Sequence, residues 1–279
     1  MRRLGREDVD TLVGWAAGEG WDPGPGDAGA FWAADPEAFL GFDRDGSLAG
    51  GGAVVAYGRE LGFVGLFILR PEHRGAGLGR ELWGEMLGDL RERLEPGAPV
   101  GLDAVAALQP FYAASGFVAA HDTARIRFGD LGPAPAGLTP LGEVPFDRLA
   151  DYDARHFGAR REPFLRAWLE LEGAVALAAL ADDGAIAGYG VLRPTGAGAK
   201  IGPLFAADTA TAERILRGLL AERPEGQAVL DVPGANPEAV ELADRLGDGE
   251  VFRTARMWLG EPPPIPWASV FGMTTLELG

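Results

Sequence analysis

One stretch decides the fold of this 279-residue chain: Val64-Gly65-Leu66-Phe67-Ile68-Leu69-Arg70-Pro71-Glu72-His73-Arg74-Gly75-Ala76-Gly77-Leu78-Gly79-Arg80-Glu81-Leu82-Trp83. It has the pattern of a strand, a glycine-rich turn and a helix. Residues 63–69 are apolar, with aromatic and β-branched side chains, which is typical of a buried strand. Pro71 ends the strand because proline lacks the backbone donor that the ladder needs. A helix then follows from the spacing of its apolar residues, which are Leu82, Trp83, Met86, Leu87, Leu90 and Leu94.

The turn carries the chemistry. Gly75, Gly77 and Gly79 have no Cβ, so a ligand can approach their backbone closely. Their N–H groups lie at the first turn of a helix, where they lack intrahelical partners and meet the positive end of the helix dipole. Such a turn is suited to a diphosphate, and Arg74 adds a positive charge.

Two common phosphate-binding loops do not fit this turn. A Walker loop ends in Gly-Lys-Ser or Gly-Lys-Thr, and a dinucleotide fingerprint has a third glycine where this chain has Arg80. The pattern Arg-x-x-Gly-x-Gly, formed by Arg74, Gly77 and Gly79, resembles the pyrophosphate loop of the GNAT acyltransferase superfamily, which binds acetyl-CoA. The alternative is an ordinary glycine-rich turn, because the chain contains 43 glycines. The resemblance implies a set of acetyl-CoA contacts, namely Ile68, Leu69, Arg74, Gly75, Ala76, Gly77, Leu78, Gly79 and Arg80.

Composition narrows the class of protein. The formal charge of −16 argues against a nucleic-acid surface, which would be basic. Without cysteine, the chain has no disulfide, thiolate metal site or cysteine nucleophile. Its three histidines show no ligand spacing, so no metal is expected. No apolar run is long enough for a membrane span or a signal peptide, and we expect a cytoplasmic protein with no membrane partner.

The order of elements recurs in the second half of the chain. Residues 131–137, rich in proline and glycine, are the expected linker between domains at 1–130 and 137–279. Four segments match in the same order, which predicts an internal duplication. They are 45–52 with 183–190, 64–67 with 201–205, 102–103 with 230–231, and 124–129 with 255–260.

The two copies differ at the turn. After Phe205 the chain has no Arg-x-x-Gly-x-Gly, and Asp208 or Thr209 can cap the following helix. An acidic residue without glycines repels a diphosphate, so the second copy is predicted to bind no CoA in the usual way. Its expected role is structural, or to shape the acceptor pocket. The chain is expected to end in a strand over residues 270–278.

A second motif supports the first. Gln109-Pro110-Phe111-Tyr112-Ala113-Ala114-Ser115-Gly116-Phe117 resembles the helix and turn of the same superfamily, in which the tyrosine hydroxyl lies near the CoA sulfur. A phenol there can protonate the departing thiolate when an amine attacks the thioester. The resemblance therefore implies Tyr112 as the catalytic acid. The alternative is that Tyr112 only packs against Phe111 and Phe117.

The resemblance covers the whole chain. It implies an α/β (α+β) fold of two tandem GNAT-like domains, each a mixed, mostly antiparallel sheet flanked by helices, with an intact first domain and a degenerate second one. In the superfamily the connection between the first two helices borders the acceptor site, which makes Glu19, Trp21, Asp22 and Asp27 candidates for binding an amine. The alternative is a solvated acidic turn with a buried tryptophan.

The resemblance implies an acetyl-CoA-dependent N-acetyltransferase that acts on a small-molecule amine by direct transfer. A backbone N–H near Ile68 and Leu69 would bind the thioester oxygen. The general base stays open among Asp103, His73 and His121, and the recurrence of Asp103 as Asp231 favours a structural part for it. Two other functions also stay open, a non-catalytic acyl-CoA-binding or regulatory module and a protein-lysine acetyltransferase. The oligomeric state is not predicted.

Overall fold

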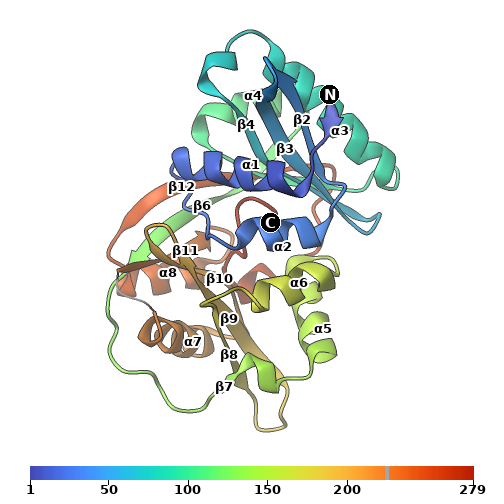
Figure 1. Ribbon diagram of the computed structural model, residues 1–279. Coiled ribbons are helices and arrows are strands. Elements are labelled where there is room, and N and C mark those ends of the chain that lie inside the picture. Colours follow the sequence, from blue (N-terminus) through green and yellow to red (C-terminus); the bar gives the residue numbers. More distant parts are fainter. Residues whose placement is uncertain (224–225) are drawn as a thin grey trace.

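The computed structural model describes residues 1–223 and 226–279, and its two halves lie one above the other with the C-terminus between them (Figure 1). The first half consists of β1 (Arg2–Arg3), α1 (Arg6–Gly18), α2 (Asp27–Ala34), β2 (Phe39–Arg44), β3 (Ser47–Tyr57), β4 (Leu61–Leu69), α3 (Leu78–Arg93), β5 (Val100–Ala104), α4 (Gln109–Ala113) and β6 (Val118–Phe128).

The second half follows the same plan with one more strand at its end. It consists of β7 (Leu138–Pro140), α5 (Phe146–Phe157), α6 (Glu162–Leu169), β8 (Val175–Leu180), β9 (Ile186–Thr195), β10 (Gly198–Ala206), α7 (Thr209–Ala221), β11 (Gln227–Pro233), α8 (Pro237–Leu246), β12 (Glu250–Leu259) and β13 (Val270–Gly272).

The two halves share one sheet and exchange their closing strands. The strand order is β1-β2-β3-β4-β5-β12-β6-β11-β10-β9-β8-β7, with β13 paired to β10. β12, from the second half, lies between β5 and β6 of the first half, and β6 pairs with β11 of the second half. The predicted linker, residues 131–137, joins β6 to β7, so it divides the sequence but does not divide the sheet.

Each exchanged strand carries a buried arginine to an aspartate of the other half. Arg256 on β12 binds Asp103 on β5 through two hydrogen bonds of 2.9 and 2.7 Å. Arg125 on β6 binds Asp231 on β11 in the same way, at 2.7 and 2.9 Å. Because the repeat relates Asp103 to Asp231 and Arg125 to Arg256, the two ion pairs are equivalent. Each ion pair therefore ties one exchanged strand to the other half, at equivalent positions of the repeat.

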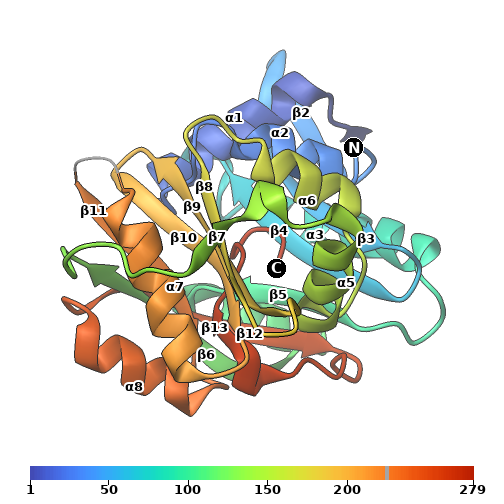
Figure 2. The same ribbon diagram turned by 90° about the horizontal axis from the view of Figure 1, so that it is seen from below.

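The helices cover the sheet in separate groups. In the first half α3 packs on β3, and in the second half α7 packs on β8, β9 and β10. A third core joins the halves, where α2 packs on α6 and α1 packs on α2 (Figure 2). Phe31 of α2 stacks on Trp168 of α6, with 6.3 Å between ring centroids. This continuous apolar contact makes the two halves one packed body.

Parallel pairing is short in both halves. β4 pairs with β5 only from Gly62–Val100 to Val64–Leu102. β10 pairs with β11 from Gly198–Gln227 to Ile201–Leu230. Beyond these points each strand pair leaves a wedge, and the two wedges are filled differently.

The structure corrects one predicted strand. The chain pairs as β13 only over Val270–Gly272, where residues 270–278 were expected to form a strand. After Gly272 it leaves β10 and crosses to the first half, where the Tyr57 hydroxyl donates to the Leu278 carbonyl oxygen at 2.8 Å. The tail therefore bridges the two halves. In the part of the chain that the structure describes, no helix has the length and apolar character of a membrane span.

Candidate active site

The glycine-rich turn forms the start of α3. Gly77 is the N-cap with φ 85°, and Gly75 has φ 81°. A Cβ at either glycine would point into open space, so the backbone is accessible to a ligand. The first intrahelical bond runs from the Arg80 N–H to the Gly77 carbonyl oxygen at 2.9 Å. The amides that precede Arg80 are therefore the unpaired donors of a helix start, an arrangement that favours an anion.

An outer groove of about 770 Å³ begins at this turn. Most of the predicted cofactor contacts line it, whereas Ala76 and Leu78 lie in the turn without lining the groove. Arg74 forms an ion pair with Glu19, from the α1–α2 connection, and its Nε donates to the Leu69 carbonyl oxygen at 2.9 Å. The residues that line the groove are Glu19, Trp21, Phe67, Ile68, Leu69, Arg74, Gly75, Gly77, Gly79, Arg80, Val105, Ala107, Leu108, Phe111 and Phe252.

A smaller cavity of about 40 Å³ continues from the groove into the wedge beyond Val64. The groove and the cavity have Trp21, Phe67, Val105, Leu108 and Phe252 in common. The volume of the smaller cavity is enough for a few water molecules or one small reacting group. Its other lining residues are Val64, Gly65, Leu66, Leu102, Asp103, Tyr112, Arg125, Thr254, Leu276 and Glu277.

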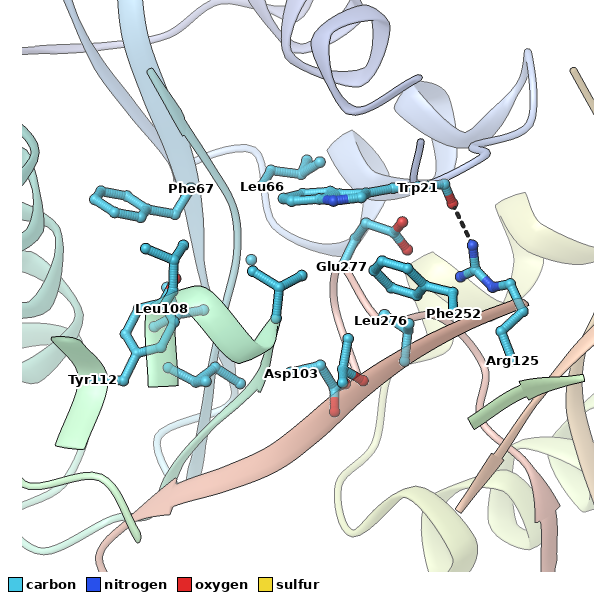
Figure 3. Close-up of a pocket in the computed structure, with 15 residues that line it drawn as sticks. Trp21, Leu66, Phe67, Asp103, Leu108, Tyr112, Arg125, Phe252, Leu276 and Glu277 are labelled. Carbon is cyan, nitrogen blue, oxygen red and sulfur yellow. Dashed lines mark hydrogen bonds between the residues drawn. The ribbon is translucent and has the colours of Figure 1, made fainter. Parts of the chain in front are cut away.

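Tyr112 reaches the inner cavity from α4, on the side opposite Trp21 and Glu277 (Figure 3). Its ring packs on Trp83 with 5.0 Å between centroids, and the Trp83 indole N–H donates to Ser115 Oγ at 2.9 Å. These contacts hold the short helix in place. Burial raises the pKa of the Tyr112 hydroxyl above the usual phenol range, so the group stays protonated at neutral pH and can act as an acid.

The residues predicted to bind the amine are divided between two places. Glu19 and Trp21 line the groove, and Trp21 also lines the inner cavity. Asp22 and Asp27 line neither. Asp22 accepts hydrogen bonds from the Thr195 hydroxyl at 2.8 Å and the Ala197 N–H at 3.1 Å.

Asp27 is fully buried and forms an ion pair with Arg193 at 3.1 Å, while its carboxylate also accepts from the Gly24 N–H at 2.8 Å. Both aspartates therefore fasten the α1–α2 connection to the second half. Neither aspartate lines the groove or the inner cavity, and Oδ1 of Asp27 is buried with no hydrogen-bond partner among the residues that the structure describes. That these two residues hold the acceptor stays a prediction.

The candidates for the general base also change. Asp103 lines the cavity, but both of its oxygens accept hydrogen bonds from Arg256, which supports the structural alternative. His73 lies in the exposed turn before α3. His121 packs against Trp267 at 4.5 Å, and burial lowers its pKa. Neither histidine lines the groove or the cavity.

Four cavity residues come from the second half and were missed by the sequence reasoning. They are Phe252 and Thr254 on β12, and Leu276 and Glu277 on the tail. Neither motif nor spacing marks them, because the strand exchange and the tail path bring them to the site. Among residues 1–223 and 226–279 no group of three or more histidine, cysteine or acidic side chains could hold a metal ion.

Comparison with known proteins shows which family has this architecture. Two sequence profiles, each described as an acetyltransferase (GNAT) domain, match residues 30–128 and 149–272. The holothin acyltransferase of Pseudoalteromonas sp. (strain SANK 73390) is 29% identical over 277 residues, covering 98% of this chain and 92% of the relative.

Solved structures agree on the fold. A candidate acetyltransferase from Pyrococcus horikoshii superposes with a TM-score of 0.82 at 21% identity, covering 100% of this chain and 95% of that protein. A tandem GNAT protein from the clavulanic acid biosynthesis pathway gives 0.60 at 18% identity, with 93% and 98% covered. The chain thus belongs to the GNAT acetyltransferase superfamily, as a tandem of two GNAT domains, and is an acyltransferase.

Proposed function

We propose that this protein transfers the acetyl group of acetyl-CoA to the amine of a small molecule. One observation carries the proposal: the groove that starts at the glycine turn runs into the cavity that holds Tyr112. A cofactor whose diphosphate binds the amides of residues 75–79 would therefore extend toward the wedge with its thioester near the Tyr112 hydroxyl. The holothin acyltransferase, similar over nearly its whole length, supports acyl transfer to a small acceptor.

The chemistry follows from the placement of the residues. Backbone donors of β4 beyond Val64, which are not paired with β5, are the candidates for binding the thioester oxygen. The amine nitrogen attacks the carbonyl carbon, the carbon–sulfur bond breaks, and Tyr112 gives its proton to the sulfur. The second half is proposed to support the site and to supply part of the acceptor pocket. Domains at 1–130 and 137–279 and a cytoplasmic location belong to the same proposal.

A screen for CoA release tests the function. Purified full-length protein and acetyl-CoA are mixed with amino sugars, polyamines, amino acids, amine antibiotics, holothin and a lysine-containing peptide. Release of CoA with a small amine supports the proposal. Turnover of the peptide alone would replace it with protein acetylation, and no release with any acceptor would contradict it.

Tyr112→Phe tests the acid. The change removes one oxygen and little volume, so the melting temperature and the acetyl-CoA affinity should stay the same. The value of kcat should fall by roughly 10²–10⁴-fold, as expected when a general acid is lost. Full activity in this variant would mean that Tyr112 only packs against its aromatic neighbours.

A further inference from the structure

The C-terminal tail lies in the first wedge and brings a carboxylate to it. After β13 the tail passes Arg161, which donates to the Thr274 hydroxyl at 2.8 Å. The Thr275 hydroxyl oxygen accepts from the Glu277 N–H at 3.0 Å and the Leu278 N–H at 2.9 Å. The Tyr57 hydroxyl then fixes the Leu278 carbonyl oxygen. Both halves thus hold the turn that carries Glu277.

Gly65 makes this path possible. A Cβ at this position would lie 1.6 Å from the Glu277 carbonyl oxygen, so only glycine lets the tail come this close to β4. The contact lies where β4 has just separated from β5. Glu277 therefore enters the wedge directly beside the strand that lines both the groove and the cavity.

The Glu277 side chain is buried without a direct partner for its charge. It is 3% exposed and lines the inner cavity, and Oε2 is buried with no hydrogen bond. Within the described ranges, 1–223 and 226–279, no cationic group lies within 4.0 Å of its carboxylate. A buried carboxylate needs a partner to offset its lost hydration. Its position on a cavity wall leaves space for that partner to be a ligand.

The surroundings of the cavity suggest what that ligand is. Trp21 and Phe252 flank Glu277, and Tyr112 lies across the cavity from it (Figure 3). An amine between these groups would meet a carboxylate on one side and a phenol on the other. That arrangement suits a proton acceptor for the attacking nitrogen and a proton donor for the departing sulfur.

We propose that Glu277 is the general base of this enzyme and binds the acceptor's amine. The inference rests on the proposed acetyl transfer. As the nitrogen–carbon bond forms and the carbon–sulfur bond breaks, the nitrogen gives a proton to the Glu277 carboxylate and the sulfur takes one from Tyr112. Exchange with solvent then restores both groups, and the products are the acetylated amine and CoA thiol.

The charged and titratable groups around Glu277 set its environment. Electrostatic interactions link it to Arg125, Lys200 and Asp27, which lie on β6, β10 and α2. Asp103, already paired with Arg256, and Tyr112 line the same cavity. Arg125 and Lys200 bring positive charge to these surroundings, and Asp27 brings a second carboxyl group.

The test compares Glu277→Gln with wild type, using an amine that the wild-type enzyme acetylates. Glutamine preserves the volume and the backbone contacts of the tail, so the melting temperature and the calorimetric Kd for acetyl-CoA should be unchanged. We expect kcat/KM to fall by roughly 10²–10⁴-fold. The acid limb of the kcat/KM pH profile should disappear, because the group that must lose a proton is gone. Glu277→Asp should keep the acid limb at a lower rate.

Glu261→Gln, an exposed change on the same C-terminal segment, is the control and should match wild type in every measurement. A Glu277→Gln enzyme with wild-type kcat/KM and an unchanged acid limb would overturn the assignment while leaving the acetyltransferase function in place. A variant that loses acetyl-CoA binding and melts earlier would also overturn it, since the carboxylate would then serve the fold.

Discussion

The two wedges of the sheet lie between equivalent pairs of strands, but different parts of the chain occupy them. In the first half the last parallel pair is Val64–Leu102, and in the second it is Ile201–Leu230, which are equivalent positions in the repeat. The second wedge is filled by the chain's own β13, with the Met273 N–H donating to the Asp231 carbonyl oxygen at 2.8 Å. The first wedge keeps a cavity. The two halves thus have equivalent strand pairs, with β13 in the second wedge and a cavity in the first.

The backbone of the tail lies close to both equivalent glycines, Gly65 and Gly202. A Cβ on Gly202 would lie 2.3 Å from the Thr274 carbonyl oxygen, just as one on Gly65 would lie 1.6 Å from that of Glu277. One segment therefore closes the second wedge and then delivers a carboxylate to the first. The second half therefore supplies part of the wall of the first half's cavity.

The turns after β4 and β10 also differ, because only the first leaves the backbone amides at its helix start open to a ligand. α3 begins at a glycine with open amides, whereas α7 begins at Asp208, whose carboxylate accepts from the Thr211 N–H at 2.7 Å. The second helix start therefore already binds an anion, its own side chain. Acyl-CoA should bind only to the first.

Gly77→Glu should have the largest effect, because it places bulk and negative charge where the diphosphate would bind. Loss of two hydrogen bonds to charged oxygens, each about 1.5–3 kcal/mol, weakens binding by roughly 10²–10⁴-fold. Isothermal titration with acetyl-CoA measures the loss. Wild type should show one site per chain.

The matched control is Ala210→Glu, an exposed residue in the first turn of α7. It should bind acetyl-CoA like wild type. Two equivalent sites in wild type, or equal losses in the two variants, would contradict the difference between the halves.

Asp103→Asn and Asp231→Asn test the strand exchange. Each leaves a buried arginine without its carboxylate, which costs about 3 kcal/mol or slightly more, because the asparagine oxygen still accepts one hydrogen bond. The loss should appear in the free energy of unfolding in urea, followed by tryptophan fluorescence. Both variants and wild type should unfold in a single transition, because each half holds a strand of the other.

Asp151→Asn is the control for this pair of variants. Asp151 pairs with Arg160 on the surface, where the two side chains are 60% and 59% exposed, so its loss should cost less than about 1 kcal/mol. Two separate transitions, one for each half, would be incompatible with the exchanged strands.

The strands, turns and helix starts could be predicted from the sequence because neighbouring residues determine them. The apolar run before Pro71 became β4, the glycine turn became the start of α3, and Asp208 caps α7 as its side chain allows. Tandem GNAT domains were predicted from motifs of this kind and are confirmed. The cofactor, acceptor and catalytic residues remain predictions.

Long-range packing decided the rest. Nothing in the sequence near Arg256 indicates that β12 pairs with β5, since the alternative pairing with β11 would satisfy the same pattern. Residues 270–278 have the composition of a strand, yet the turn at Thr275 and the missing side chain of Gly65 direct them across the molecule. The acidic residues Asp22 and Asp27 resemble an amine site, but their partners Thr195 and Arg193 lie in the other half.

The smallest expected effect is a change of stability with pH that comes from Lys200, at another pair of equivalent positions in the two halves. It occupies the position in β10 that Phe63 occupies in β4, and its Nζ donates to the Trp21 carbonyl oxygen at 3.0 Å. Burial lowers the pKa of this lysine, the chain's one lysine, to about 8 from 10.5. Between those pH values the unfolded chain binds a proton that the folded protein does not, so stability rises with pH by about 1.4 kcal/mol per unit.

From pH 7 to pH 9 roughly one unit of this window is crossed, and wild type should gain about 1 kcal/mol of unfolding free energy relative to Lys200→Met. Taking the difference removes the contributions of all other titrating groups, and the lost hydrogen bond to Trp21 adds only a constant. Urea unfolding of both proteins at pH 7, 8 and 9 measures it. A constant difference would mean that Lys200 keeps an ordinary pKa because the nearby carboxylates of Glu277 and Asp231 offset its burial. In that case Glu277 would be partnered by the lysine rather than available to an amine, so this small shift also bears on how the second half serves the first.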